Sequence, residues 1–478
     1  SSCVTPDGHY LITGGQYENF LRVWDLKNAM LAARLQTGEL MGWVDLRISP
    51  DGKKISAMKA GTLYCFSAEN WRLLAQEPFG REARYAWFPD SERIAVVRVS
   101  GLKGRHAGEI YALRTGKRVT LFDGDFPGAN DVAVSPDGKL VAVAETSLSK
   151  PSIRLLRTDS GATAGTMPGL KYSIHRIMFT DDGKKIIGKN SEGFREWNIS
   201  DGSFRELPGG ARFFVKRSGG RLCVLANGIF ILNQDSGVLS PTVIDAEFVR
   251  ENLALAANGF HHPSAPVIFF PCGDGAIRMV NYETGKMTVF CGSKTNADWL
   301  IFNNDGYWDA NGGGSSMVAA RKGDAVSAID QFAIEYNRPD RIIADIPGGE
   351  PAAVSYFKSE YERRCRRMGI DPGAVGTAGD VPEIRDMSVK RNGNIATVSF
   401  RIVPNGTVVS RYSVYVNGVP VFGAEGKKTG GAVISEKVAL TTGANRIEVS
   451  CFTAGGAESI RAAATEHLDE TILGNLYF

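Results

Sequence analysis

A tight-turn signal recurs about every forty residues through the first three hundred residues of this chain. Each copy is a version of Pro-Asp-Gly, in which proline presets φ, aspartate caps the turn and glycine accepts a left-handed conformation. The copies lie at 6–8, 50–52, 89–91, 136–138, 181–183 and 218–220. A repeat of this length restricts the fold to an array of similar supersecondary units.

Short alternating apolar stretches flank each turn, which is the pattern of two antiparallel strands. A third stretch follows and ends in a large apolar or aromatic residue, namely Trp24, Phe66, Tyr111, Leu155, Trp197 or Ile231. A polar turn and a fourth strand complete each unit. A seventh, poorer copy has its last two strands at 277–290, while the stretch "NGFHHPSAP" blurs its first hairpin. Four short strands per repeat predict an all-β chain that begins with a seven-bladed β-propeller over residues 1–293.

The pattern of strands and turns changes at residue 381. Three Asn-Gly pairs, at 392–393, 405–406 and 417–418, separate alternating strands, and both residue types tolerate the positive φ of hairpin turns. Five to seven short strands predict a small immunoglobulin-like β-sandwich over 381–463. Residues 464–478 are predicted to be a tail that leads toward a further C-terminal domain.

Residues 294–380 are predicted to be an exit seam from the propeller and a helical linker. One helix is expected over 351–368, because apolar residues recur there at spacings of three and four. Proline begins this helix and Gly369 ends it, as capping rules prefer. Four arginines crowd its last turn and are predicted to form a solvated face: Arg363, Arg364, Arg366 and Arg367.

Composition and charge limit the partners. A net charge of +3 provides no dense basic face, so nucleic acid and acidic lipid are not expected partners. No apolar run is long enough to span a bilayer. The seven cysteines are scattered without a C-x-x-C pair, which favours reduced core residues and a cytoplasmic location. A signal peptide removed ahead of the first residue stays open.

No catalytic, cofactor or metal site is predicted. The histidines lie outside nucleophile and zinc motifs, and adjacent His261 and His262, with Cys272, would point to opposite faces of a strand. The Asp- and Asn-rich stretches 123–131 and 303–313 lack calcium-loop spacing. The glycines at 312–314 have no following Lys-Ser or Lys-Thr, so a phosphate-binding loop is not expected.

The first array resembles the WD-repeat family, on the strength of "SPDGK" at 49–53 and 135–139 and the dipeptide Trp24-Asp25. The match is degenerate, because the family's Gly-His dipeptide is absent and only one unit has Trp-Asp. The hydrogen-bond network that WD-repeat blades share therefore has no residue-by-residue counterpart here.

The seam carries a more specific resemblance. The stretches "DWLIFNNDGYWDANGGG" and "DQFAIEYNRPDRI" resemble the junction in bacterial multidomain proteins that place a WD-repeat propeller and an immunoglobulin-like segment ahead of a caspase-like peptidase domain. The matching residues are Trp299, Gly306, Tyr307, Trp308, Asp309, Phe332, Tyr336, Arg338, Pro339 and Asp340. Asn337 is inserted where family members often have Tyr-Arg directly. The final residues "NLYF" resemble the start of that peptidase domain, and its catalytic residues would lie beyond Phe478.

The resemblance implies a non-catalytic interaction and scaffolding arm of a caspase-like protease. Its partners would be proteins, including a caspase-like domain in cis or in trans. The candidate interaction residues are Trp299, Tyr307, Trp308, Asp309, Tyr336, Arg338 and Asp340. Two alternatives stay open. A propeller enzyme or a small-ligand or metal-binding propeller would need polar side chains converging on the axis, and an extracellular adhesion module would need disulfides or a secretion signal.

Overall fold

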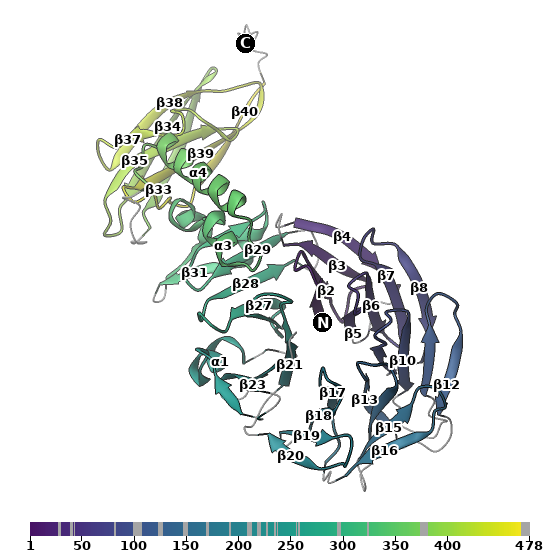
Figure 1. The fold of residues 1–478 in the computed structure, drawn as a ribbon. Helices are drawn as coiled ribbons and strands as arrows, with labels where there is room; N and C mark the ends of the chain where they lie inside the picture. The colour runs from purple at the N-terminus through teal and green to yellow at the C-terminus, as the bar shows by residue number, and fades with distance from the viewer. Residues whose placement is uncertain are drawn as a thin grey trace. The chain divides into compact units, whose positions relative to one another are not determined.

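Short antiparallel strands make up most of the chain in the computed structural model (Figure 1). The structure describes residues 1–26, 30–38, 42, 44–80, 83–98, 108–122, 128–146, 152–168, 172–190, 193–207, 213–217, 221–225, 228–233, 236, 238–254, 256, 259–293, 298–322, 325–372 and 381–469. The predicted turn 218–220, most of the acidic stretch 123–131 and the terminal "NLYF" lie outside these residues. The chain divides into two units, Ser1–Met287 and Thr288–Phe478.

Six four-stranded antiparallel sheets follow one another in the first unit. The first three consist of β1 (Ser2–Val4), β2 (Tyr10–Gly14), β3 (Phe20–Asp25) and β4 (Met30–Gln36); β5 (Val44–Ile48), β6 (Lys54–Lys59), β7 (Thr62–Ser67) and β8 (Leu73–Pro78); β9 (Ala83–Trp87), β10 (Arg93–Arg98), β11 (Gly108–Ala112) and β12 (Arg118–Phe122). The next three consist of β13 (Ala129–Val134), β14 (Leu140–Glu145), β15 (Ile153–Arg157) and β16 (Thr163–Met167); β17 (Arg176–Phe179), β18 (Lys185–Lys189), β19 (Phe194–Asn198) and β20 (Phe204–Leu207); β21 (Phe213–Arg217), β22 (Arg221–Leu225), β23 (Ile229–Asn233) and β24 (Leu239–Pro241).

A six-stranded sheet follows, in the order β25-β26-β27-β28-β29-β30. Its strands are β25 (Phe260–His261), β26 (Val267–Pro271), β27 (Ala276–Asn281), β28 (Met287–Gly292), β29 (Trp299–Asn303) and β30 (Trp308–Ala310). The division between the two units falls within β28. A short helix that the sequence did not predict, α1 (Ala246–Asn252), precedes this sheet, and the side chain of Asp245 caps its N-terminus.

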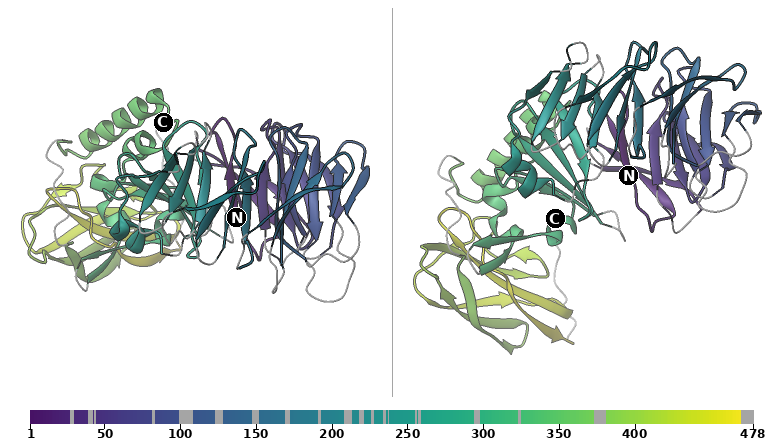
Figure 2. Two further views of the ribbon diagram at one scale, coloured as in Figure 1. Left: turned by 60° about the horizontal axis from the view of Figure 1, so that its bottom comes forward. Right: turned by 90° about the horizontal axis from the view of Figure 1, so that it is seen from below.

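The first strand of each four-stranded sheet lies toward a common centre and the fourth lies outside (Figures 1 and 2). First strands of neighbouring sheets contact one another, as in the pairs β1 with β5, β9 with β13, and β13 with β17. Apolar side chains from adjoining sheets share cores; one of them joins the sheets of β9–β12 and β13–β16. The array is therefore propeller-like.

The repeated turns pack head to tail. A Cβ at Gly52 would lie 2.6 Å from Cγ of Pro6, in the turn of the preceding sheet, so glycine is required by close approach as well as by its φ of +75°. A Cβ at Gly8 would lie 2.4 Å from Nε2 of His262, which belongs to the last sheet. The first turn thus packs against the hairpin that contains the stretch "NGFHHPSAP".

In four of the turns, a hydroxyl two residues before the aspartate supplies a further hydrogen bond; these aspartates are Asp7, Asp51, Asp137 and Asp182. Ser135 Oγ donates to Asp137 Oδ1 at 2.6 Å, and Thr180 Oγ1 donates to Asp182 Oδ1 at 2.6 Å. Each aspartate also accepts a backbone N–H two residues later. These hydrogen bonds hold the pKa of both carboxyls below the ordinary value.

Helices and short strands connect the first array to the second set of sheets. They are η1 (Gly314–Met317), β31 (Ala319–Lys322), β32 (Ala325–Ala328), η2 (Ile329–Phe332), α2 (Ala333–Tyr336), α3 (Pro339–Asp345) and α4 (Pro351–Arg367). The predicted helix over 351–368 matches α4, which ends before Gly369 at a φ of +65°. Among the described helices none is long and apolar enough to cross a membrane.

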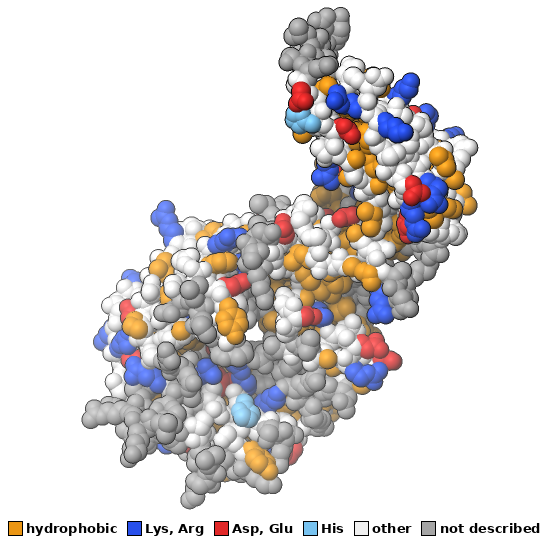
Figure 3. Space-filling model, turned by 180° about the vertical axis from the view of Figure 1, so that it is seen from behind, with side chains coloured by type: hydrophobic (Ala, Val, Ile, Leu, Met, Phe, Trp, Pro, Cys, Tyr) orange, Lys and Arg blue, Asp and Glu red, His pale blue; other side chains and the backbone are white. Residues whose placement is uncertain are grey.

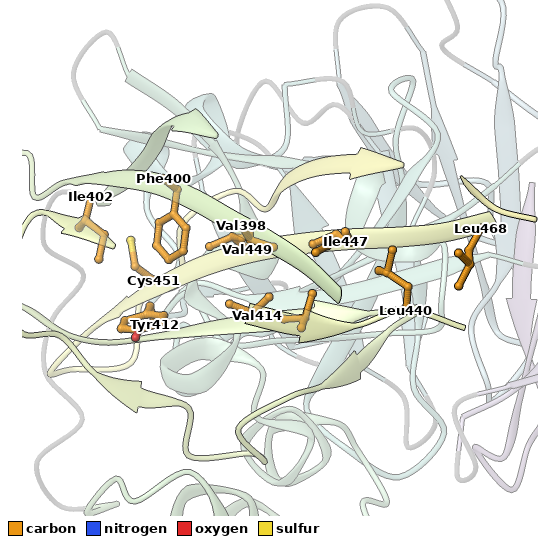
Figure 4. Packing of buried hydrophobic residues seen from close by; sticks show 12 residues of the cluster. Val398, Phe400, Ile402, Tyr412, Val414, Leu440, Ile447, Val449, Cys451 and Leu468 are labelled. Atoms are coloured by element: carbon orange, nitrogen blue, oxygen red, sulfur yellow. The ribbon is translucent and has the colours of Figure 1, made fainter. Parts of the chain in front are cut away.

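Two antiparallel sheets enclose the core of the C-terminal region (Figure 4). One contains β33 (Glu383–Asn392), β34 (Ile395–Val403) and β38 (Val433–Ala439). The other contains β35 (Val409–Val416), β36 (Val419–Pro420), β37 (Lys427–Lys428), β39 (Gly443–Thr453) and β40 (Ala462–Leu468). Alternate residues of β34 and β39 are buried between the sheets, as the alternating sequence predicts.

The described cysteines are free, and four of them are buried: Cys3, Cys65, Cys365 and Cys451. Burial raises the pKa of the Cys65 thiol to about 12, so it stays protonated and unreactive. On the face that Figure 3 shows, basic, acidic and hydrophobic side chains are interspersed.

Candidate functional site

Four of the predicted interaction residues lie around the turn between β29 and β30. The rings of Tyr307 and Tyr336 are 6.1 Å apart, and the guanidinium of Arg338 lies 5.9 Å from the Tyr307 ring. Trp308, in β30, is 7% exposed. We call Tyr307, Trp308, Tyr336 and Arg338 the seam cluster.

Trp308 is held by the segment that follows α2. Its carbonyl accepts a hydrogen bond from the backbone N–H of Arg338 at 3.0 Å, and Asn337 forms a parallel bridge with it. The residue that departs from the family motif, Asn337, is therefore part of this pairing. The indole N–H of Trp308 is buried and has no hydrogen-bond partner among the described residues.

Arg338 and Asp340 form an ion pair at the start of α3. Arg338 Nε and Nη2 donate to the two carboxylate oxygens of Asp340 at 2.8 and 2.7 Å, and Arg338 lies 3.9 Å from the centre of the Tyr361 ring. Asp340 is buried and the Arg338 side chain is only 11% exposed, so this bidentate ion pair is largely shielded from water. These two residues position α3 and α4.

Trp299 and Asp309 are half-buried. The backbone N–H of Trp299 donates to Asn311 Oδ1 at 2.8 Å at the start of β29. Asp309 Oδ1 accepts the N–H of Ala310 at 2.9 Å. Burial raises the pKa of Asp309 to about 6, against the opposing effects of that hydrogen bond and of the Arg364 charge.

The prediction that four arginines form a solvated face is wrong for Arg364. Its guanidinium donates to Asn337 Oδ1 at 3.0 Å and to the carbonyls of Asn337 and Ala333 at 2.9 and 3.2 Å. Burial lowers its pKa. Arg364 stands three residues after Tyr361, so it shares the inward face of α4, and this spacing was the available signal. The other three arginines are exposed, as predicted: Arg363, Arg366 and Arg367.

The linker also contacts the C-terminal sheets within the second unit. Gln331 Nε2 donates to the carbonyl of Glu458 at 3.2 Å, and the Glu458 N–H donates back to Gln331 at 2.8 Å. A Cβ at Gly456 would lie 2.7 Å from Cγ2 of Ile334. Linker and sheets are thus joined by reciprocal bonds and close packing.

An open pocket of about 440 Å³ lies beside the seam cluster. It is lined by Asn304, Asp305, Gly306, Trp308, Ala320, Arg321, Ser327, Ile329, Phe332 and Tyr336. Three aromatic side chains and an arginine are among these residues, and such residues dominate the energetics of protein interfaces. All three aromatic residues belong to the motif found in the sequence, but no pocket was predicted there.

The first unit contains a second polar region, which the sequence analysis missed. Asp45, Arg84, Asp131 and Arg176 each stand six positions before the aspartate of their turn. They occupy equivalent positions near the start of the first strands β5, β9, β13 and β17. Counting back from each turn would have revealed this alternation of acid and base. We call these four residues, with Arg47 and Lys189, the axial cluster.

Electrostatic contacts link members of the axial cluster across several sheets. Arg47 Nη2 lies 3.0 Å from Asp45 Oδ2 and 3.9 Å from Asp131 Oδ1. Asp131 Oδ2 accepts the backbone N–H of Ile177 at 2.9 Å. Asp45 interacts electrostatically with Arg47, Arg176 and Arg84, so charges from β5, β9 and β17 lie near one another. Burial raises the pKa of Asp131, against the opposing charges of Arg176 and Arg47.

The histidine pair is used for local structure. His262 Nδ1 accepts the backbone N–H groups of Ser264 and Ala265 at 3.2 and 3.0 Å, and His261 Nε2 lies 3.1 Å from the Tyr282 hydroxyl. Cys272 Sγ donates to the carbonyl of Phe270. Within the described part of the chain, no group of three or more His, Cys, Asp or Glu side chains has the arrangement of a metal site.

No family model matches the sequence, and no curated protein matches it. Solved structures similar to this chain include hydrazine synthase from Kuenenia stuttgartiensis, with 16% identity over 62% of this chain and 95% of that chain and a TM-score of 0.45. A chain of a mitotic checkpoint complex has 12% identity over 57% of this chain and 83% of that chain, with a TM-score of 0.46. At these levels the similarities carry no conclusion about function.

Proposed function

We propose that this chain is a non-catalytic protein-interaction and scaffolding arm for a caspase-like peptidase domain, supplied in cis or in trans. The arm consists of a seven-bladed WD-repeat-like propeller, the linker helices and an immunoglobulin-like β-sandwich. Each four-stranded sheet is a blade, and the six-stranded sheet contains the seventh. The seam motif is the part of the sequence that motivates the peptidase partner.

The aromatic pocket beside Trp308 is the observation that carries the interaction. Phe332, Tyr336 and Trp308 offer apolar contact area, while Arg321 and Asp305 offer polar groups at the same pocket. The ring of Trp308 contributes apolar area to the lining, while its indole N–H is buried. A pocket lined by aromatic residues that takes one side chain of a partner is a suitable anchor for an interface.

The linker connects this pocket to the C-terminal sheets. Part of the pocket's lining comes from β32, η2 and α2, and the bonds between Gln331 and Glu458 tie the same segment to the C-terminal sheets. Occupation of the pocket would therefore bias the arrangement of elements that adjoin the β-sandwich. A peptidase attached to or bound beside the β-sandwich would experience that bias.

The test uses two adjacent residues of β32 whose side chains lie on opposite faces of the strand. Ser327 lines the pocket, whereas Val326 is 68% exposed and does not line it. Ser327→Trp should fill the pocket, and Val326→Trp adds the same bulk outside it. Binding of a separately expressed caspase-like domain from the same reading frame is measured by calorimetry.

We expect Ser327→Trp to weaken binding at least tenfold and Val326→Trp to leave it unchanged. Equal affinities of the two variants would show that the pocket does not bind the partner. A reading frame without such a domain, or a domain that does not bind, would refute the caspase-like partner. Peptide cleavage by the purified chain would contradict the non-catalytic role.

A further inference from the structure

The axial cluster has an excess of positive charge. Among the described residues it combines Asp45 and Asp131 with Arg47, Arg84, Arg176 and Lys189. Arg47 lies between the two carboxylates and is paired with both. Four cations against two carboxylates give these six residues an excess of two positive charges.

Two of these cations face each other directly. Arg176 of β17 and Lys189 of β18 are partners in the strand register, so their side chains lie on the same face of the sheet. Like charges opposite one another destabilise a strand pair. Both residues are partly buried. A sequence that keeps an unfavourable pair in its interior points to a functional site.

The same cations have unused hydrogen-bonding capacity. Within the described part of the chain, the side chains of Arg84, Arg176 and Lys189 form no hydrogen bond and no ion pair within 4.0 Å, although Arg84 and Arg176 both act electrostatically on Asp45. Arginine presents a planar fork of N–H donors and lysine presents three donors. Donors from β9, β17 and β18 are therefore available to a ligand.

We propose that Arg84, Arg176 and Lys189 form a binding site for a phosphate group at the centre of the first unit. A phosphate dianion would neutralise the two excess charges and separate Arg176 from Lys189. Its oxygens can accept bonds from both guanidinium groups and the ammonium group. Asp131 and Asp45 limit the affinity by repulsion and keep the arginines oriented. This site is independent of the pocket at Trp308.

The experiment is calorimetric titration of the full chain with inorganic phosphate and, separately, with adenosine monophosphate, at constant ionic strength set with chloride. We expect saturable binding of at least one probe. Tighter binding of inorganic phosphate would identify a free-phosphate site, and tighter binding of the nucleotide would identify a site for a phosphorylated small molecule. Absence of saturable binding of both would overturn the proposal.

Three variants locate the site. Arg176→Gln should weaken binding about tenfold or more, since a hydrogen bond from a charged group is lost. Asp131→Asn should tighten binding, because it removes a competing carboxylate while an amide oxygen can still accept the Ile177 N–H. Arg157→Gln, on an exposed arginine of β15, should have no effect. Unchanged affinity in Arg176→Gln would refute the site.

A stability measurement separates ligand binding from a structural role. Without phosphate, Arg176→Gln and Lys189→Met should unfold at the same or a higher temperature than the unsubstituted chain, because each removes the repulsion between the paired cations. Phosphate should raise the unfolding temperature of the unsubstituted chain more than that of either variant. A lower unfolding temperature of both variants without phosphate would show that the fold itself needs these cations, and would contradict the proposal.

Discussion

Replacing Asp309 with asparagine should stabilise the second unit above pH 7. Burial raises the pKa of this carboxyl from 3.8 to about 6, so the folded state favours its protonated form. The difference corresponds to about 3 kcal/mol at 1.36 kcal/mol per pH unit, and this is an upper value because part of the side chain reaches solvent. Asparagine keeps the oxygen that accepts the Ala310 N–H but carries no charge.

The sign follows from the direction of the shift. A group whose pKa is raised on folding stabilises the fold at low pH, and this contribution is lost as pH rises from about 4 to above 6. The Asp309→Asn protein should not lose this stability as the pH rises. It should match the unsubstituted protein at pH 4 and exceed it at pH 8.

Scanning calorimetry from pH 4 to pH 8 measures this difference. For a unit of this size, 1 kcal/mol corresponds to about 2–4 °C, so the variant should gain several degrees at pH 8. Asp305→Asn removes an exposed carboxylate from the preceding turn and serves as the control. Equal pH dependence of the unsubstituted and Asp309→Asn proteins, or a less stable variant at pH 8, would refute the assignment of burial as the cause.

Three further outcomes are expected. Arg338→Lys should destabilise the second unit by about 2 kcal/mol in chemical denaturation, because an ammonium cannot replace the fork on buried Asp340; an unchanged midpoint would contradict this. Gly456→Val should lower the free energy of unfolding by more than about 2 kcal/mol, because its Cβ would meet Ile334 and its backbone has a φ of +96°. A decrease of less than 2 °C in the unfolding temperature would contradict this. The hydroxyl two residues before Asp182 lowers the pKa of its carboxyl, so the ionised carboxylate stabilises the fold above pH 4 and this contribution is lost as pH falls. Asp182→Asn should therefore flatten the decline of the unfolding temperature between pH 5 and pH 3, and an unchanged decline would contradict this.

The local elements were predictable because their causes are local. Pro-Asp-Gly turns depend on the φ preferences of three adjacent residues, and the apolar stripe of α4 depends on helical spacing. The predicted limits of that helix agree with α4 within one residue at its end. The short helices α2 and α3 were missed, since helices of one or two turns leave little periodicity to detect.

The candidate sites depended on contacts between segments that lie far apart in the sequence. The motif Gly-Tyr-Trp-Asp drew attention to Trp308, but only the fold places Phe332 and Ser327 beside it to form a pocket. Arg364 was predicted to be solvated because it is one of four arginines in the last turn of the helix. The structure shows three hydrogen bonds to Ala333 and Asn337 instead, which no rule based on helix ends could anticipate.

The sequence by itself determined the all-β class, the repeated hairpins, the position of the main linker helix and the segment that connects the two sets of sheets. These follow from turn chemistry and from periods of two and 3.6 residues, which act over a few positions. The tertiary structure alone decided which charges meet. Asp45 and Arg176 are 131 positions apart in the chain, and they interact because successive sheets turn about a common centre and bring their first strands together.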